Sequence, residues 1–178
     1  MVVLTLFVFS SVSFASSYKS VLKKWTRGAK DYTFQDLEMR LDWKATFFSD
    51  EFRGARREKL QSVLQLTEVE RGEEEVKDQE SNSKYDEFFV GIYAGSNVYP
   101  DIGKNSGEWR LAIDVGGKVV KAESIKKVHV TDLERKLYPY LNHWSHAYLV
   151  RFPKTIREGD HFSLKMLGVP ATSELTWD

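Results

Sequence analysis

The chain has 178 residues, 42% of them hydrophobic and 13% aromatic, which is enough for one buried core and too short for two full domains. Its 26 Lys and Arg side chains balance 26 Asp and Glu side chains, so no global field favours nucleic-acid binding. Cysteine is absent, which excludes disulfides, thiolate metal sites and cysteine nucleophiles. The composition therefore predicts a globular fold that is stabilised by packing alone.

The first residues, "MVVLTLFVFSSVSFASS", carry no charged side chain. Ser13 and Ala15 supply the two small residues that precede a signal-peptidase cut. The run is shorter than the roughly 20 apolar residues that cross a bilayer as a helix. These features predict that residues 1–15 are a signal peptide and that the protein is periplasmic or extracellular. A basic n-region is missing, so an uncleaved anchor is the alternative.

Residues 16–36 form an expected amphipathic segment, because Val21, Leu22, Trp25 and Ala29 recur at helical spacing among lysines and Arg27. Every helix that docks on its own domain shows this pattern, so docking through Trp25 is the preferred interpretation. Contact with a membrane surface through residues 18–30 is the alternative.

A strand is expected where "EMRLDWKATF" alternates strictly between apolar and polar residues. Ser49 then has the character of a helix N-cap, with acidic residues in the first turn, and predicts a helical insertion over residues 50–66. The basic residues of this insertion are Arg53, Arg56, Arg57 and Lys59, and acids interrupt them. We expect them to form a solvated face.

Residues 67–84, "TEVERGEEEVKDQESNSK", have few apolar residues and no aromatic ones. Such a segment lacks the burial that repays its ordering entropy, so it is expected to be an exposed acidic loop. The glycine and ligand spacing of an EF-hand calcium loop are absent. The loop is interpreted as a spacer.

From Asp86 onward the apolar period is two residues almost everywhere, with turn residues between the runs. Gly116 and Gly117 fit a two-residue hairpin turn, and Thr131 with Glu134 has capping-box spacing. Residues 37–178 are therefore expected to be a mainly β domain, an antiparallel immunoglobulin-like β-sandwich with one or two accessory helices. The predicted core includes Trp43, Trp109, Leu111 and Leu149, and Tyr138, Tyr140 and Trp144 are expected to cover its end.

Five segments carry a diffuse family resemblance across about residues 40–177: "RLDWKATFFSDEFRGARREKL", "FFVGIYAG", "EWRLAIDVGGK", "LYPYLNHWSHAYLVRFP" and "GDHFSLKMLG". In this order they resemble small uncharacterised proteins of bacterial cell envelopes, which are often lipoproteins. The resemblance implies an envelope location and an immunoglobulin-like sandwich, and no activity or cofactor. The chain has no cysteine for lipidation, so only export carries over.

Histidine chemistry is the main catalytic alternative. His143 and His146 lie three residues apart, and the other possible donors, His129, His161, Asp132 and Asp160, are distant in the sequence. Ser145 lacks a G-x-S-x-G elbow, and "GKNSG" at residues 103–107 lacks the P-loop pattern. We therefore predict no catalytic, cofactor-binding or metal-ligating residue.

The expected function is that of an exported, non-catalytic binding or structural module with an envelope protein partner. A histidine- or metal-dependent hydrolase and a peripheral membrane-surface protein are the alternatives.

Overall fold

The structure is a computed structural model, and it describes residues 17–32, 39–93, 102, 109–168 and 172–178. The expected signal peptide, residues 1–15, and the "GKNSG" turn, residues 103–107, lie outside the described residues. Within the described part, the chain is mainly antiparallel β, with nine strands in two sheets and four helices. This confirms the expected mainly β class, with more helices than the one or two anticipated.

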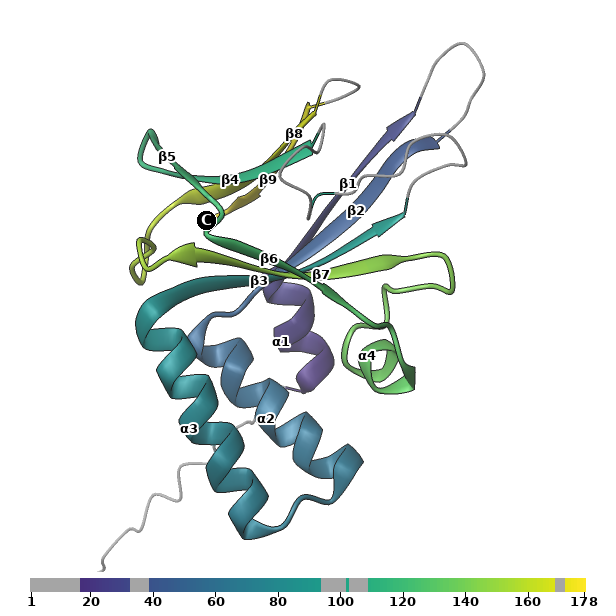
Figure 1. Cartoon of the computed structure of the whole chain (residues 1–178), viewed down its shortest axis with the longest axis vertical. Coiled ribbons are helices and arrows are strands. Elements are labelled where there is room, and N and C mark those ends of the chain that lie inside the picture. Colours follow the sequence, from purple (N-terminus) through teal and green to yellow (C-terminus); the bar gives the residue numbers. More distant parts are fainter. Residues whose placement is uncertain (1–16, 33–38, 94–101, 103–108, 169–171) are drawn as a thin grey trace, which may run out of the picture.

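The larger sheet has the strand order β1-β2-β3-β7-β6, and all its pairs are antiparallel. Its strands are β1 Thr26–Tyr32, β2 Met39–Phe47, β3 Tyr85–Tyr93, β6 Ser124–Val128 and β7 His146–Pro153. The smaller sheet has the order β5-β4-β8-β9. Its strands are β4 Trp109–Val115, β5 Lys118–Lys121, β8 Phe162–Gly168 and β9 Thr172–Trp177. Figure 1 shows the smaller sheet stacked over one face of the larger.

The space between the sheets holds the main core, because alternate residues of each strand point into it. Trp43, Trp109 and Leu111 are buried there, as the sequence predicts. Four aromatic residues are in ring contact at its centre: Phe47, Phe88, Phe162 and Trp177. Leu149 is half-buried and faces the other way, so its predicted place in this core is wrong.

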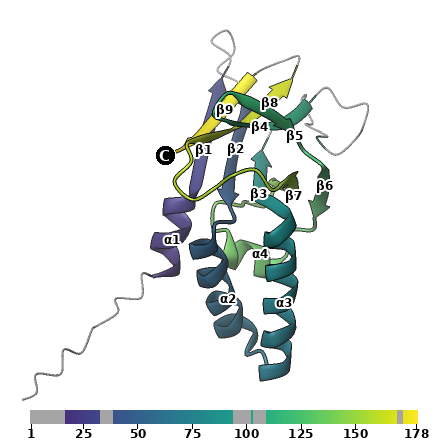
Figure 2. The ribbon, with the colours of Figure 1, turned by 90° about the vertical axis from the view of Figure 1, so that its left-hand side faces the viewer.

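Four helices accompany the larger sheet on the face that points away from the smaller one (Figures 1 and 2). They are α1 Tyr18–Trp25, α2 Asp50–Leu64, α3 Glu68–Lys84 and α4 Asp132–Leu137. Ser49 caps α2 by accepting a hydrogen bond from the Phe52 amide, as its position predicts. Helices α1, α2 and α4 supply Val21, Leu22, Phe52, Leu60 and Leu137 to a second core over this face. Because this layer covers the outer face, β3 is buried on both sides.

Residues 68–84 are a helix rather than the expected acidic loop. Thr67 and Glu70 form a capping box at its start, and three intrahelical ion pairs, including Lys84–Glu80 at 2.6 Å, line its surface. No described residue of α3 is buried. The loop prediction is wrong because it depends on low apolar content alone, whereas the Thr67–Glu70 capping box indicates the start of a helix.

The expected amphipathic segment 16–36 is two elements within its described part. Helix α1 ends at Trp25, and β1 begins at Thr26 as an edge strand of the larger sheet, paired with β2. Residues 26–30 are therefore strand and not helix, which corrects the prediction based on Ala29 and Arg27.

Two local predictions are confirmed by backbone geometry. Gly116 and Gly117 have φ values of 58° and 86° in the turn between β4 and β5. Positive φ at both central residues is what a two-residue hairpin turn of this kind needs. Thr131 and Glu134 form a capping box at the start of α4.

Candidate functional site

The histidines do not assemble into a site. His129, His143 and His161 are exposed, and His146 is half-buried at the start of β7. His161 lies 3.4 Å from Asp178. Among the described residues, no group of three His, Cys, Asp or Glu side chains is placed to hold a metal ion.

Ser145 is committed to a turn. Its hydroxyl accepts from the Asn142 amide and donates to the Asn142 side-chain oxygen, each at 3.0 Å. The Trp144 amide donates to the same oxygen at 2.8 Å. A serine hydroxyl with these hydrogen bonds stabilises the turn and is not a nucleophile activated by a histidine. Trp144 itself is 74% exposed, so the prediction that it covers the core is wrong.

A buried charge network joins α2, α3 and the larger sheet. The Arg53 guanidinium lies 2.5 Å from the Asp78 carboxylate of α3 and 2.8 Å from the Glu87 carboxylate of β3, and its side chain is only 3% exposed. Arg53 also donates from Nε to the Phe48 carbonyl at 3.0 Å. Two further arginines complete the network, with Arg57 on Asp78 at 2.5 Å and Arg151 on Glu87 at 2.7 Å. Arg53 and Arg57 are therefore not the solvated face that the sequence predicts.

Glu87 is the carboxylate on which this network is centred. Burial alone would raise its pKa, but the hydrogen bonds from Arg53 and Arg151 outweigh burial and hold the pKa below its ordinary value. Glu87 thus stays ionised inside the fold. Because Arg53 bridges Glu87 and Asp78, the network ties the base of α3 to the sheet.

The aromatic layer under α2 is closely packed. The Tyr138 ring stacks on Phe89 with centroids 3.7 Å apart and an interplanar angle of 5°. Burial raises the pKa of Tyr138 to about 12. Arg56 lies near this hydroxyl and over the Phe48 ring, 5.6 Å from its centroid. These contacts make α2 part of the second core.

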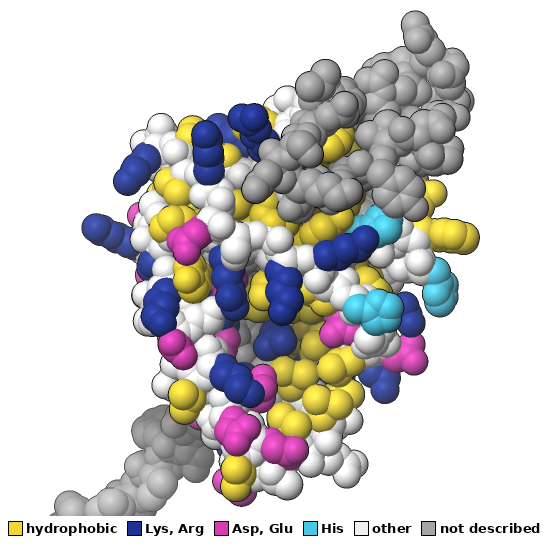
Figure 3. All heavy atoms as spheres, in the orientation of Figure 1, with side chains coloured by type: hydrophobic (Ala, Val, Ile, Leu, Met, Phe, Trp, Pro, Cys, Tyr) yellow, Lys and Arg dark blue, Asp and Glu magenta, His cyan; other side chains and the backbone are white. Residues whose placement is uncertain are grey.

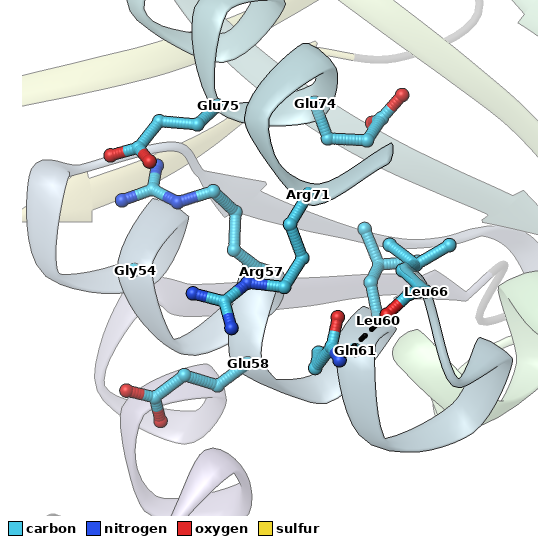
Figure 4. Close-up of a pocket in the computed structure, with 9 residues that line it drawn as sticks. All are labelled: Gly54, Arg57, Glu58, Leu60, Gln61, Leu66, Arg71, Glu74 and Glu75. Carbon is cyan, nitrogen blue, oxygen red and sulfur yellow. Dashed lines mark hydrogen bonds between the residues drawn. The ribbon is translucent and has the colours of Figure 1, made fainter. Parts of the chain in front are cut away.

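Between α2 and α3 lies an open hollow of about 400 Å³ (Figure 4). Leu60 and Leu66 line it together with polar and charged side chains: Arg57, Glu58, Gln61, Arg71, Glu74 and Glu75. Gly54 also lines it and leaves room, since a Cβ there would meet nothing within 4 Å. Figure 4 shows Arg71 reaching across from α3, and Arg57 and Glu75 pointing toward each other.

The polar groups of this hollow include one buried acceptor without a donor. Gln61 donates from Nε2 to the Leu66 carbonyl at 2.9 Å, and its buried Oε1 has no donor. The lining contains no histidine, serine, threonine or tyrosine, and its ionisable groups are arginines and glutamates. An apolar wall with a charged rim and one unsatisfied acceptor is suited to receive a side chain of another protein.

The outer surface of α3 carries the most exposed valines of the structure's described part. Val69 and Val76 are 72% and 64% exposed, one on each side of Gly72, and Leu64 at the end of α2 is 49% exposed. Together with the hollow, these residues make the α2–α3 hairpin the candidate functional site. Figures 1 and 2 show the hairpin projecting from the body of the protein.

Helix α1 is docked on the domain, as preferred from the sequence. Tyr18 donates to the Leu137 carbonyl at 2.6 Å, and Trp25 donates to Glu51 at 2.9 Å while its ring contacts Phe47. Trp25 is therefore held in a protein environment. None of the helices that the structure describes combines the length and apolar composition needed to span a bilayer.

The contacts that hold the hairpin are not visible in the sequence. Helical spacing places Arg53 and Arg57 on one face of α2, but only the fold shows that Asp78 lies opposite them. The sequence did contain one usable signal, the Thr67–Glu70 capping box that begins α3. That capping box predicts the start of α3, but it does not predict that α3 packs beside α2.

The fold and the site define a class: an antiparallel two-sheet β protein with a helical layer and a projecting helical hairpin. Comparison of the chain with models of known protein families gives no match. Comparison with curated proteins gives no match either. The functional argument therefore depends on the molecule's own chemistry.

Proposed function

We propose that this protein is an exported, non-catalytic module of the cell envelope that binds a partner protein through its α2–α3 hairpin. The observation that carries the proposal is that α3 is a 17-residue helix with no buried residue. Most helices of globular proteins are stabilised by burying one apolar face. Helix α3 lacks such a face toward its own chain, while Val69 and Val76 remain exposed on it.

The hairpin is built as a supported arm. Its inner helix α2 is fixed by Phe52 and Leu60 in the second core. Its outer helix is held through polar contacts in its C-terminal half, where Asp78 meets Arg53 and Arg57 and Asn82 donates to Asp50. Val69 and Val76 are seven residues apart, a spacing at which helix anchors enter a partner groove.

The proposed export is supported by the uncharged apolar start and the small residues before Ser16. The experiment is mass spectrometry of the protein from fractionated cells, with mature protein beginning at Ser16 as the expected result. Intact residues 1–15 in a soluble cytoplasmic pool would contradict it. The finer fold proposal, an immunoglobulin-like topology, is supported by the two packed antiparallel sheets and by the family resemblance.

The binding proposal is tested by a photo-crosslinking amino acid placed at Val76, with Arg157 as the control. Both sites are exposed, and Arg157 lies outside the hairpin, in the loop between β7 and β8. We expect a discrete protein adduct in living cells from Val76 and none from Arg157. The same adducts from both positions, or none from Val76 or Val69, would reject the hairpin as the binding surface.

A further inference from the structure

The chain is neutral overall, but its charge is segregated. The α3 sequence, "EVERGEEEVKDQESNSK", has seven acidic and three basic side chains, a net charge of −4. The stretch from Lys118 to Val128, "KVVKAESIKKV", has four lysines and one glutamate, a net charge of +3. The protein therefore carries two oppositely charged surfaces on separate elements.

The basic surface is formed by Lys118, Lys121, Lys126 and Lys127, which we term the lysine strip. All four are exposed on β5 and β6, the edge strands of the two sheets. Within the described part of the chain, none of the four has a carboxylate within ion-pair distance. Val119 follows Lys118 on β5 and is 57% exposed. Figure 3 shows Lys and Arg side chains spread over this upper part of the surface.

The acidic surface is the exposed side of α3 around Val69 and Val76. Figure 3 shows acidic side chains at the lower end of the molecule, where α2 and α3 project, as well as elsewhere on this face. Each surface thus has at least one exposed valine, and the two surfaces differ in the sign of their net charge. Such a pair is complementary in both charge and apolar contact.

We propose that the hairpin's partner includes a second copy of this chain, whose lysine strip receives the acidic face of α3. This inference rests on the proposed function and names the partner for the same surface. Contact between two α3 helices or between two lysine strips would set like charges together, so the contact joins α3 of one copy to the lysine strip of another. A symmetric dimer that makes this contact twice and a head-to-tail chain both satisfy this pairing.

Size limits the strength of this contact. Helix α3 is about 25 Å long at 1.5 Å per residue. The edge strands β5 and β6 extend only about 13 to 17 Å each at 3.3 Å per residue. A patch of these dimensions falls below the roughly 800 Å² per partner of a standard interface, so we expect a weak, salt-sensitive association.

The first measurement is sedimentation velocity of the protein, purified as the cell processes it, from about 10 μM to 1 mM, a range chosen for a weak interface. In buffer of low ionic strength, the average mass should rise with concentration above that of the monomer, to a dimer for a reciprocal contact and beyond it for a head-to-tail contact. In 0.5 M NaCl the association should fall steeply.

Charge reversal identifies the surfaces. Lys126→Glu with Lys127→Glu should weaken association about tenfold, and so should Glu73→Lys with Glu80→Lys on α3. The variant with all four substitutions should associate again, because the two surfaces have exchanged signs. The matched control is Lys19→Glu with Lys23→Glu, two exposed lysines of α1 outside both surfaces, and it should associate like the wild type.

Three results would overturn the inference. The first is a wild type that stays monomeric at 1 mM, a result that leaves another protein as the hairpin's partner and so spares the proposed function. The second is association that survives both reversals or is not restored in the four-substitution variant, with circular dichroism confirming that each variant is folded. The third is a monomeric protein that cosediments with phosphatidylglycerol vesicles only while Lys126 and Lys127 are intact, which would assign the strip to anionic lipid.

Discussion

The substitution Arg53→Met tests whether the buried charge network holds the hairpin to the sheet. It keeps most of the aliphatic volume but removes the guanidinium shared by Asp78 and Glu87, whose side chains are 12% and 4% exposed. Removing one partner of a buried ion pair costs about 3 to 5 kcal/mol, because a desolvated charge is left behind. Arg57 still pairs with Asp78, and Arg151 with Glu87, so we expect the lower end, about 3 kcal/mol.

The assay is thermal unfolding followed by circular dichroism. A loss of about 3 kcal/mol corresponds to a fall in Tm of about 6 to 12 °C for a domain of this size. The control is Arg71→Met, which removes an exposed pair with Glu68 at 3.7 Å and should cost less than about 1 kcal/mol. Hydrogen exchange should also become faster in α3 for Arg53→Met. A Tm for Arg53→Met equal to that of Arg71→Met would refute the structural role given to the network.

Three further predictions concern other parts of the fold. The pKa of Glu87 is lower in the folded protein than its ordinary value of 4.5. The ionised carboxylate therefore stabilises the fold fully above pH 4.5, and this stabilisation is lost as the pH falls through the folded pKa. In urea unfolding at a series of pH values, Glu87→Gln should reduce the loss of stability on the acid side. Gly54→Ala and Gly72→Ala should each raise the free energy of unfolding by about 0.5 to 1 kcal/mol, since a Cβ meets nothing within 4 Å at either helical position; a lower Tm would contradict this. Trp109→Ala should lower the free energy of unfolding by about 3 to 5 kcal/mol, because Trp109 is buried in the core. Trp144→Ala, at an exposed site, should leave the urea midpoint nearly unchanged. Equal effects of the two substitutions would contradict the burial of Trp109.

The strands were predictable because their signal is local. Alternation in β2 and β4 predicts that Trp43 and Trp109 face the core, and this prediction does not depend on which strands are their partners. Leu149 shows where this reasoning fails. It lies on the opposite face of β7, and that face is apolar because helices cover it. A period of two cannot tell which of two covered faces meets the other sheet.

The hairpin was predictable only in part because its stabilising contacts are distant in sequence. Arg53 and Asp78 are 25 residues apart, and Arg53 and Glu87 are 34 apart. Charged residues in a sequence are expected on the surface, and nothing local distinguishes Arg53 from its exposed neighbour Glu51. The contacts that hold the candidate site together join residues distant in the sequence, and this distance is why the sequence does not predict them.

The place of the hairpin in the chain has a consequence for how this architecture can vary. Helices α2 and α3 leave from β2 and return to β3, which are neighbouring strands paired at Phe47 and Phe88. The tip can therefore gain or lose helical turns without disturbing the register of any strand. Loop closure adds only about 0.6 kcal/mol for each doubling of loop length. Each added turn would move the tip outward by about 5.4 Å. Homologous chains can thus differ in the reach of this arm while sharing the same sheets, and arm length is the dimension in which we expect them to diverge.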